Sequence, residues 1–294
     1  MDVVDTSRSL SRVPAGLVLL AALAVAAPPL EQARELYQRT EYEAALNLLR
    51  AVPHKDAATY HLMGRCYYMQ GDPRKAGEVF EHAVELSPGE SDNYLWLGRA
   101  FGRRAELSSF LTAPGYASKA RESFEKAVKL NPQNLEAMSD LFEYYLEAPG
   151  MLGGGLDKAA SLAARMAQLN PSEGQWAQAR LAEKRKEDST AEEHLRRAVD
   201  LAPRQASRLV DLARLLANKG RYEESEEAFR RAESIAPGSP RTMFARASVY
   251  IKCRRNIDLA RQLLKRYLES PLTPDDPPRR EAERLLRQVS ALSS

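Results

Sequence analysis

Apolar positions between Ala57 and Glu90 recur at a spacing that predicts two consecutive amphipathic helices. In the first set, the pair Met63-Gly64 stands three or four residues from both Tyr60 and Tyr67, so the four share one helical face. After the polar turn Gly71-Asp72, a second set repeats this spacing: Ala76, Phe80 and Ala83. Pro88 then ends the second helix, because proline cannot donate the helical hydrogen bond. The pattern therefore predicts a hairpin of two helices, A and B.

The same hairpin pattern recurs along residues 30–270. Its units are predicted at about 30–53, 57–90, 91–134, 135–171, 172–205, 206–239 and 240–270. An amphipathic segment follows at 278–290, and it is expected to cap the last unit because a solenoid must cover its terminal apolar face. The predicted fold class is all-α: an α-solenoid of about seven helical hairpins with a C-terminal capping helix.

The third and fourth units are longer than the others, and both gain residues between helix A and helix B. The additional residues include 105–116 in the third unit and 148–155 in the fourth. Because insertions in a repeat array lie on one face, which often is functional, we expect these two loops to touch and form a hydrophobic lobe. The lobe residues are Phe110, Leu111, Tyr116, Met151 and Leu152. The alternative is that the two loops merely cover each other's apolar side chains.

These spacings resemble the tetratricopeptide repeat family over most of residues 30–270. The family pattern is carried most fully by one unit, at Tyr60, Met63-Gly64, Tyr67, Ala76, Phe80, Ala83 and Pro88. The long third and fourth units also resemble a recurring kind of bacterial secreted tetratricopeptide protein of unassigned activity. The resemblance implies a right-handed superhelix whose A helices line a concave groove for segments of partner proteins. It implies no enzyme activity.

In this family, set positions of helix A face the concave side, and the resemblance places a row of basic residues there. The row comprises Arg65, Arg99, Arg103, Arg180, Lys184, Arg214 and Lys252, accompanied by His61, Tyr68, Leu95, Trp176 and Phe244. Glu143 and Glu147 interrupt the row in the fourth unit. One interpretation is a basic groove for an acidic partner segment, because arginine makes bidentate contacts with carboxylates. The other is that each arginine pairs with an acid on an adjacent helix.

Motifs and charge give no indication of catalysis, a metal or nucleic acid. The chain has four histidines and two cysteines, and none stands at a spacing typical of a zinc site. The triplet Gly153-Gly154-Gly155 before Lys158 lacks the Gly-Lys-Ser/Thr order of a phosphate loop. A formal net charge of +3 is too small to indicate nucleic acid. We therefore expect a protein or peptide partner, no cofactor, no small-molecule substrate and no enzyme activity.

The start of the chain differs from the repeats. Arg8 and Arg12 precede an apolar run at 13–27, which contains Ala24-Val25-Ala26 and is followed by Pro28-Pro29. We interpret residues 1–26 as a secretory signal peptide that is cut after Ala26, which predicts a periplasmic or cell-envelope location. The alternative is an uncleaved inner-membrane anchor, although the run is shorter than the ~20 apolar residues of a spanning helix. Membrane contact is expected only through this segment.

Two functions are compatible with these predictions. The first is a non-enzymatic interaction scaffold that binds a partner segment in the basic groove. The alternative is an accessory subunit that docks and regulates a cell-envelope enzyme through the inserted loops of the third and fourth units. A stable enzyme that co-purifies with the chain would favour the alternative.

Overall fold

The computed structural model describes residues 28–291, so the predicted signal peptide lies outside the described residues. Over this range the chain forms fifteen α-helices, one 3-10 helix and no strand, which confirms the all-α prediction. The A helices are α1 (Pro29–Gln38), α3 (Ala57–Gln70), α5 (Ser91–Leu107), α7 (Leu135–Glu147), α9 (Pro171–Lys184), α11 (Ala206–Asn218) and α13 (Pro240–Lys252). The B helices are α2 (Tyr42–Arg50), α4 (Pro73–Leu86), α6 (Ala113–Leu130), α8 (Leu156–Leu169), α10 (Asp188–Leu201), α12 (Tyr222–Ile235) and α14 (Ile257–Glu269). The 3-10 helix η1 (Gly150–Leu152) precedes α8, and α15 (Arg279–Ala291) follows α14.

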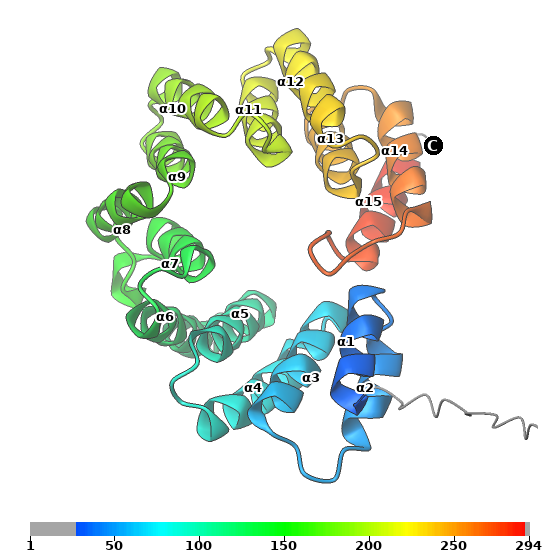
Figure 1. Ribbon diagram of the computed structural model, residues 1–294. Coiled ribbons are helices and arrows are strands. Elements are labelled where there is room, and N and C mark those ends of the chain that lie inside the picture. The colour runs from blue at the N-terminus through cyan, green and yellow to red at the C-terminus, as the bar shows by residue number, and fades with distance from the viewer. Residues whose placement is uncertain (1–27, 292–294) are drawn as a thin grey trace, which may run out of the picture.

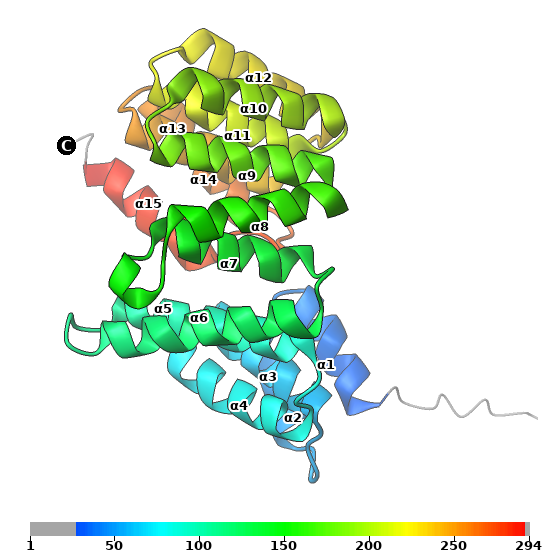
Figure 2. The same ribbon diagram turned by 90° about the vertical axis from the view of Figure 1, so that its left-hand side faces the viewer.

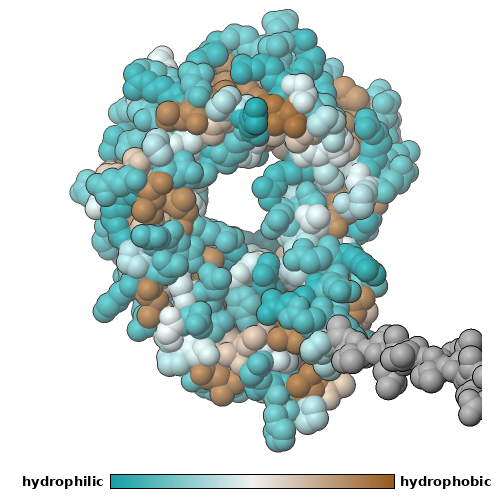
Figure 3. Space-filling view, in the orientation of Figure 1, coloured by the Kyte–Doolittle hydropathy of each residue, from teal (hydrophilic) through white to brown (hydrophobic). Residues whose placement is uncertain are grey.

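Successive hairpins stack side by side and curve into a ring. From α3 onward the A helices lie on the inner side of the ring and the B helices on the outer side (Figure 1). Seen from the side, the helices of neighbouring hairpins run roughly parallel to one another, stacked along the wall of the ring (Figure 2). An opening passes through the centre (Figure 3). None of the helices within 28–291 combines the length and hydropathy that crossing a bilayer requires.

The turn between α3 and α4 shows how local sequence ends one helix and begins the next. Gly71 ends α3 in the left-handed conformation, with φ of 80°, which glycine adopts without steric penalty. Asp72 then caps α4 by accepting a hydrogen bond from the Lys75 backbone N–H at 3.1 Å. Pro73 occupies the first turn, where its missing N–H is not needed. This compact turn folds helix B directly back on helix A.

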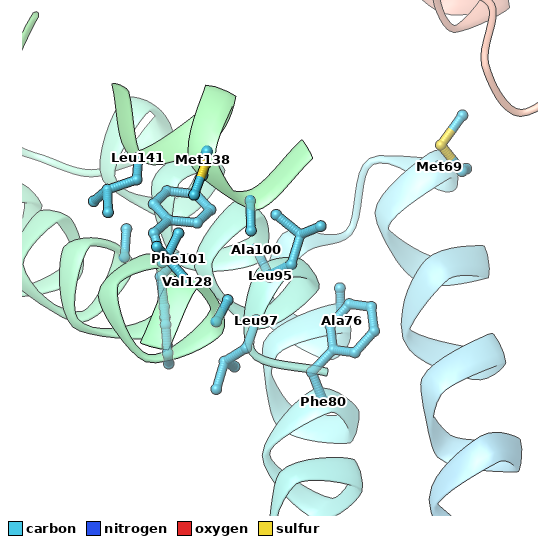
Figure 4. Packing of buried hydrophobic residues seen from close by; sticks show 14 of the residues in the cluster. Met69, Ala76, Phe80, Leu95, Leu97, Ala100, Phe101, Val128, Met138 and Leu141 are labelled. Atoms are coloured by element: carbon cyan, nitrogen blue, oxygen red, sulfur yellow. The ribbon is translucent and has the colours of Figure 1, made fainter. Parts of the chain in front are cut away.

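Small residues allow the two helices of a hairpin to pack closely. A Cβ atom added to Gly64 would lie 2.6 Å from the ring of Phe80, and one added to Gly98 would lie 2.6 Å from the ring of Phe124. The buried side chains continue from one hairpin to the next, as Figure 4 shows from Phe80 to Leu141. The core is therefore a continuous layer between inner and outer helices, as expected where each repeat contacts its neighbours.

A proline-rich segment at 271–278, here called the strap, leads from α14 into the interior of the ring (Figure 1). Arg241 of α13 donates a hydrogen bond to the backbone oxygen of Asp275, and the Tyr267 hydroxyl donates one to that of Pro277. Helix α15 then buries Ala282, Leu285 and Val289 in the apolar cluster formed by α13 and α14. The strap and the start of α15 share a cavity with Thr40, Tyr42 and Met69 of the first two hairpins. The two ends of the array therefore meet.

Candidate functional site

Aromatic rings and guanidinium groups alternate across the first three A helices. The guanidinium carbon of Arg65 lies 4.7 Å from the ring centre of Tyr37 and 4.6 Å from that of Trp96. On the other side of Trp96, the guanidinium carbon of Arg99 lies 4.6 Å from the same ring. Arg65 Nε also donates a hydrogen bond to the Tyr37 hydroxyl at 3.1 Å. Such cation–π contacts are attractive, so the stack holds two predicted groove residues in fixed positions.

Several basic residues of the predicted groove pair with carboxylates on neighbouring inner helices. The pairs are Arg99 with Asp140 (2.5 Å) and Glu136 (2.7 Å), Arg180 with Glu143 (2.9 Å), and Lys184 with Glu147 (2.7 Å). Arg103 pairs within its own helix with Glu106 at 2.5 Å. The acids that seemed in the sequence to interrupt the basic row are therefore its counter-ions. At these positions the structure agrees with the interpretation of internal pairing.

The other predicted groove residues differ in their solvent exposure. Leu95 is completely buried within the hydrophobic core, so its prediction as a groove residue is wrong. His61 is partly buried, and its Nδ1 lies 2.8 Å from the amide oxygen of Asn93. Burial lowers the pKa of His61 from its ordinary value. The aromatic members Tyr68, Trp176 and Phe244 are partly buried, whereas Lys252 is exposed.

Two cavities flank the strap on the inner side of the ring, and their charges differ. The first, of about 640 Å³, lies against α3, α5 and α7, and its lining includes three basic residues and the acids Glu106, Asp140, Glu143, Asp276 and Glu281. The second, of about 840 Å³, lies against α11 and α13 and is lined by Arg204, Arg214, Arg241 and one acid, Asp211. The basic character expected of the whole groove is thus concentrated in its C-terminal half.

The insertion of the third unit is not a long loop, which corrects that prediction. Helix α5 continues to Leu107 and α6 begins at Ala113, so only 108–112 connect them. Tyr116 lies on α6 and packs back against α5. Its ring centre is 6.4 Å from that of Phe101, and the Arg104 guanidinium carbon is 4.1 Å from the Tyr116 ring centre. With these contacts, α5 and α6 are each about one turn longer than the helices of the other hairpins. Tyr116 therefore does not belong to the predicted lobe.

Three of the predicted lobe residues are almost fully exposed. Phe110 is 83% exposed, Leu111 75% and Met151 92%, and we refer to these three as the apolar tips. Such values contradict both expectations: these side chains neither form the predicted lobe with one another nor cover each other. Leu152 is partly buried, and its backbone oxygen accepts a hydrogen bond from the Tyr144 hydroxyl at 2.9 Å. The apolar tips lie at the turns between helices A and B, on the same edge of the ring (Figure 2).

Family models described as tetratricopeptide repeats match residues 57–90, 106–134, 177–240 and 210–277. Together these matches cover more than half of the chain. The chain belongs to the tetratricopeptide repeat family. Tetratricopeptide arrays are scaffolds for protein–protein interaction and generally are not enzymes, and this array has the same repeated hairpin.

Solved tetratricopeptide structures share this fold. A tetratricopeptide repeat protein from Parabacteroides merdae superposes with a TM-score of 0.58 at 14% identity, covering 89% of this chain and 97% of that one. A thermophilic tetratricopeptide protein from Thermus thermophilus gives a TM-score of 0.52 at 23% identity, covering 64% of this chain and 97% of that one. No curated protein matches the chain. At these identities the likeness establishes the fold and carries nothing about the partner.

The tetratricopeptide pattern alone did not identify all residues of the inner face. Trp96 and Tyr37 were not predicted as groove residues, yet both stack on guanidinium groups. A signal for Trp96 was available, because it precedes Arg99 by three residues and therefore shares a helical face with it. Arg204 and Arg241 were also missed, since they stand just before or at the start of an A helix, outside the family's groove positions.

Proposed function

We propose that the chain is a non-enzymatic scaffold that holds an extended segment of another protein against the inner side of its ring. The observation that carries this proposal is the inner face itself, which is hollowed by two cavities on either side of the strap. Its side chains are held by ion pairs and by the Tyr37–Arg65–Trp96–Arg99 stack. A surface fixed in advance loses little conformational entropy on binding. Because the strap enters the ring, an extended segment fits this space better than a folded domain.

Site-specific photo-crosslinking in the cells that produce the protein tests this proposal. A photoreactive residue would replace Arg103 or Arg214, which line the two cavities, or Arg74 or Arg230, which are exposed on outer helices. We expect the inner positions to yield one shared crosslinked protein, identified by mass spectrometry, that the outer positions do not yield. Equal yields of the same proteins from inner and outer positions would contradict a partner held inside the ring.

The exposure of the apolar tips favours a second candidate function, docking to a cell-envelope enzyme as its accessory subunit. Large apolar side chains that are exposed on one edge of a protein are typical of interaction sites. Replacing Phe110, Leu111 and Met151 together by Ser should abolish co-purification of such an enzyme. The same change at Leu86, Leu169 and Leu201, which are also exposed but lie at the ends of B helices, is the matched control. Equal loss in both variants, or none in either, would count against docking through the tips.

We also propose that the protein is exported, on the basis of the apolar run and small residues that precede Pro28. N-terminal sequencing of the native protein tests this directly. Cleavage after Ala26 would leave Ala27 as the first residue. Recovery of an intact Met1 would instead indicate an uncleaved anchor or no export.

A further inference from the structure

Three exposed arginines surround the cavity between α11 and α13, and they are not neutralised as Arg99 and Arg180 are. In the part of the chain that the structure describes, neither Arg204 nor Arg241 pairs with a carboxylate. The guanidinium of Arg241 donates instead to the backbone oxygen of Asp275. Arg214 is 53% exposed, and its Nη1 is 3.6 Å from Asp211. Their charges are therefore available to a ligand.

The one acid that lines this cavity does little to cancel these charges. The Asp211 carboxylate already accepts a hydrogen bond from Arg208 Nη1 at 3.0 Å, and Arg208 itself is buried. The first turns of α11 and α13 also line the cavity, through Ser207 and Thr242. Because helix N-termini carry partial positive charge, they add to the potential of the arginines. The cavity is thus positive at its rim.

The floor of the same cavity is apolar. Val210 and Ala245 lie there and are buried, and Phe244 and Ile235 are partly buried beside them. Pro277 of the strap also lines the cavity. The volume of about 840 Å³ is large enough for several side chains of an extended peptide. An apolar floor below a positive rim fits a segment that carries both apolar side chains and carboxylates.

We infer that the cavity between α11 and α13 binds an extended acidic segment of a partner protein, in which carboxylates flank an apolar side chain. The carboxylates contact Arg204, Arg214 and Arg241, and the apolar side chain packs on Val210 and Phe244. This inference rests on the proposed scaffold function and specifies where on the inner face charge is recognised. It differs from the sequence-based expectation, in which the row through Arg65, Arg99 and Arg180 had this role.

Binding of defined peptides to the full chain tests the inference. The probe is a fluorescent peptide with the sequence Asp-Glu-Leu-Phe-Asp-Glu and both termini blocked, compared with its charge-reversed version, Lys-Arg-Leu-Phe-Lys-Arg. We expect fluorescence anisotropy to show saturable binding of the acidic peptide only. Because exposed charge pairs are screened by salt, raising the ionic strength from ~0.05 M to ~0.5 M should weaken binding.

Matched charge reversals locate the site. The variant Arg204→Glu/Arg214→Glu/Arg241→Glu should bind the acidic peptide at least roughly tenfold more weakly, since three attractive charge contacts become repulsive. The control Arg74→Glu/Arg197→Glu/Arg230→Glu changes the net charge equally on exposed outer positions and should retain binding. The double variant Arg204→Glu/Arg214→Glu leaves the contact of Arg241 with the strap intact, and it should also bind more weakly.

Two outcomes would overturn the inference. One is equal weakening in the inner and outer triple variants, which would indicate general charge attraction. The other is no binding of the acidic peptide, or binding unaffected by the inner reversals. If photo-crosslinking at Arg103 and Arg214 still captures a shared partner in that case, the scaffold function stands and only the acidic specificity of this cavity fails.

Discussion

The guanidinium of Arg280 lies directly over Gly71, joining the last helix of the array to the second hairpin. A Cβ atom added to Gly71 would be 1.0 Å from Arg280 Nη1, so any side chain there would displace the guanidinium. Gly71 ends α3, and a cation at the C-terminus of a helix is favourable. Arrays of this kind are held together by contacts between adjacent repeats. Here a contact between the two ends of the array is added to them.

Substitution of Gly71 by Ala should therefore destabilise the protein more than the same change at Gly220. Both glycines follow an A helix with positive φ, 80° and 75°, so both substitutions place Ala in a strained conformation that costs roughly 1–2 kcal/mol. Nothing lies within 4 Å of a Cβ on Gly220, whereas Arg280 blocks the one on Gly71. Urea denaturation followed by circular dichroism measures the difference.

A double-mutant cycle isolates the contribution of ring closure. In the background of Arg280→Ala, Gly71→Ala should lower the free energy of unfolding only as much as Gly220→Ala does, because the guanidinium that blocks the new Cβ atom is absent. Small-angle X-ray scattering of Arg280→Ala should also show a larger radius of gyration if this contact holds the ends together. If Gly71→Ala lowers the free energy of unfolding equally with and without Arg280, the two residues are not coupled.

The hairpins could be predicted from the sequence because each depends on residues close in the chain. Gly64 with Phe80 and Gly98 with Phe124 are intrahairpin contacts, and their residues recur in a fixed pattern. Closure by Arg280 could not be predicted, because it depends on small rotations between hairpins that accumulate along the array.

The ion pairs of the inner face could not be predicted from the sequence either. Asp140 and Glu143 were present in the sequence, but their pairing with Arg99 and Arg180 depends on how adjacent A helices are rotated. Helical periodicity determines which side chains share one face of a helix. It does not determine which residue of the neighbouring helix each of them contacts. For that reason the sequence alone did not decide between the two interpretations of the basic row, and it did not reveal that Leu95 is buried.

Two glycines of the same helix, Gly98 and Gly102, should respond to Ala in opposite directions. Ala has higher helix propensity than Gly by roughly 1 kcal/mol, and nothing lies within 4 Å of a Cβ on Gly102. Gly102→Ala should therefore stabilise the protein by roughly 0.5–1 kcal/mol. At Gly98 the Cβ would meet the Phe124 ring at 2.6 Å, and overpacking of ~1–3 kcal/mol outweighs the gain. Thermal unfolding of both variants checks this, and equal shifts of Tm would refute the packing role of Gly98.

Removal of Arg99 should destabilise the protein more at neutral pH than at acid pH. Burial raises the pKa of Asp140 above its ordinary value, and Arg99 beside it limits this rise. Without Arg99 the pKa of Asp140 rises further, so more stability is lost as pH increases through the titration of this carboxyl. We expect Arg99→Ala to lose roughly 1–3 kcal/mol more at pH 7 than at pH 4, relative to wild type at each pH.

The control for this effect removes the titrating group. In Arg99→Ala/Asp140→Asn, residue 140 is uncharged at both pH values, so the additional loss of unfolding free energy at pH 7 should disappear. Urea denaturation at the two pH values measures it. A pH-dependent loss that persists in the double variant would assign the effect to another group, such as Glu136, which also pairs with Arg99.

His61 should make the array less stable as pH falls below neutrality. Burial lowers the pKa of His61 from 6.5, so the unfolded chain takes up a proton at a higher pH than the folded chain does. The stability contributed by the neutral ring is complete above pH 6.5 and is lost as pH falls toward the folded-state pKa, by at most about 1.4 kcal/mol per pH unit.

His61→Gln keeps a polar group opposite Asn93 and cannot titrate, so its free energy of unfolding should change less between pH 7 and pH 5 than that of wild type. As the matched control, His82→Gln replaces an exposed histidine on α4 in the same way, and its free energy of unfolding is measured at the same two pH values. The assignment fails if the two variants show the same pH dependence.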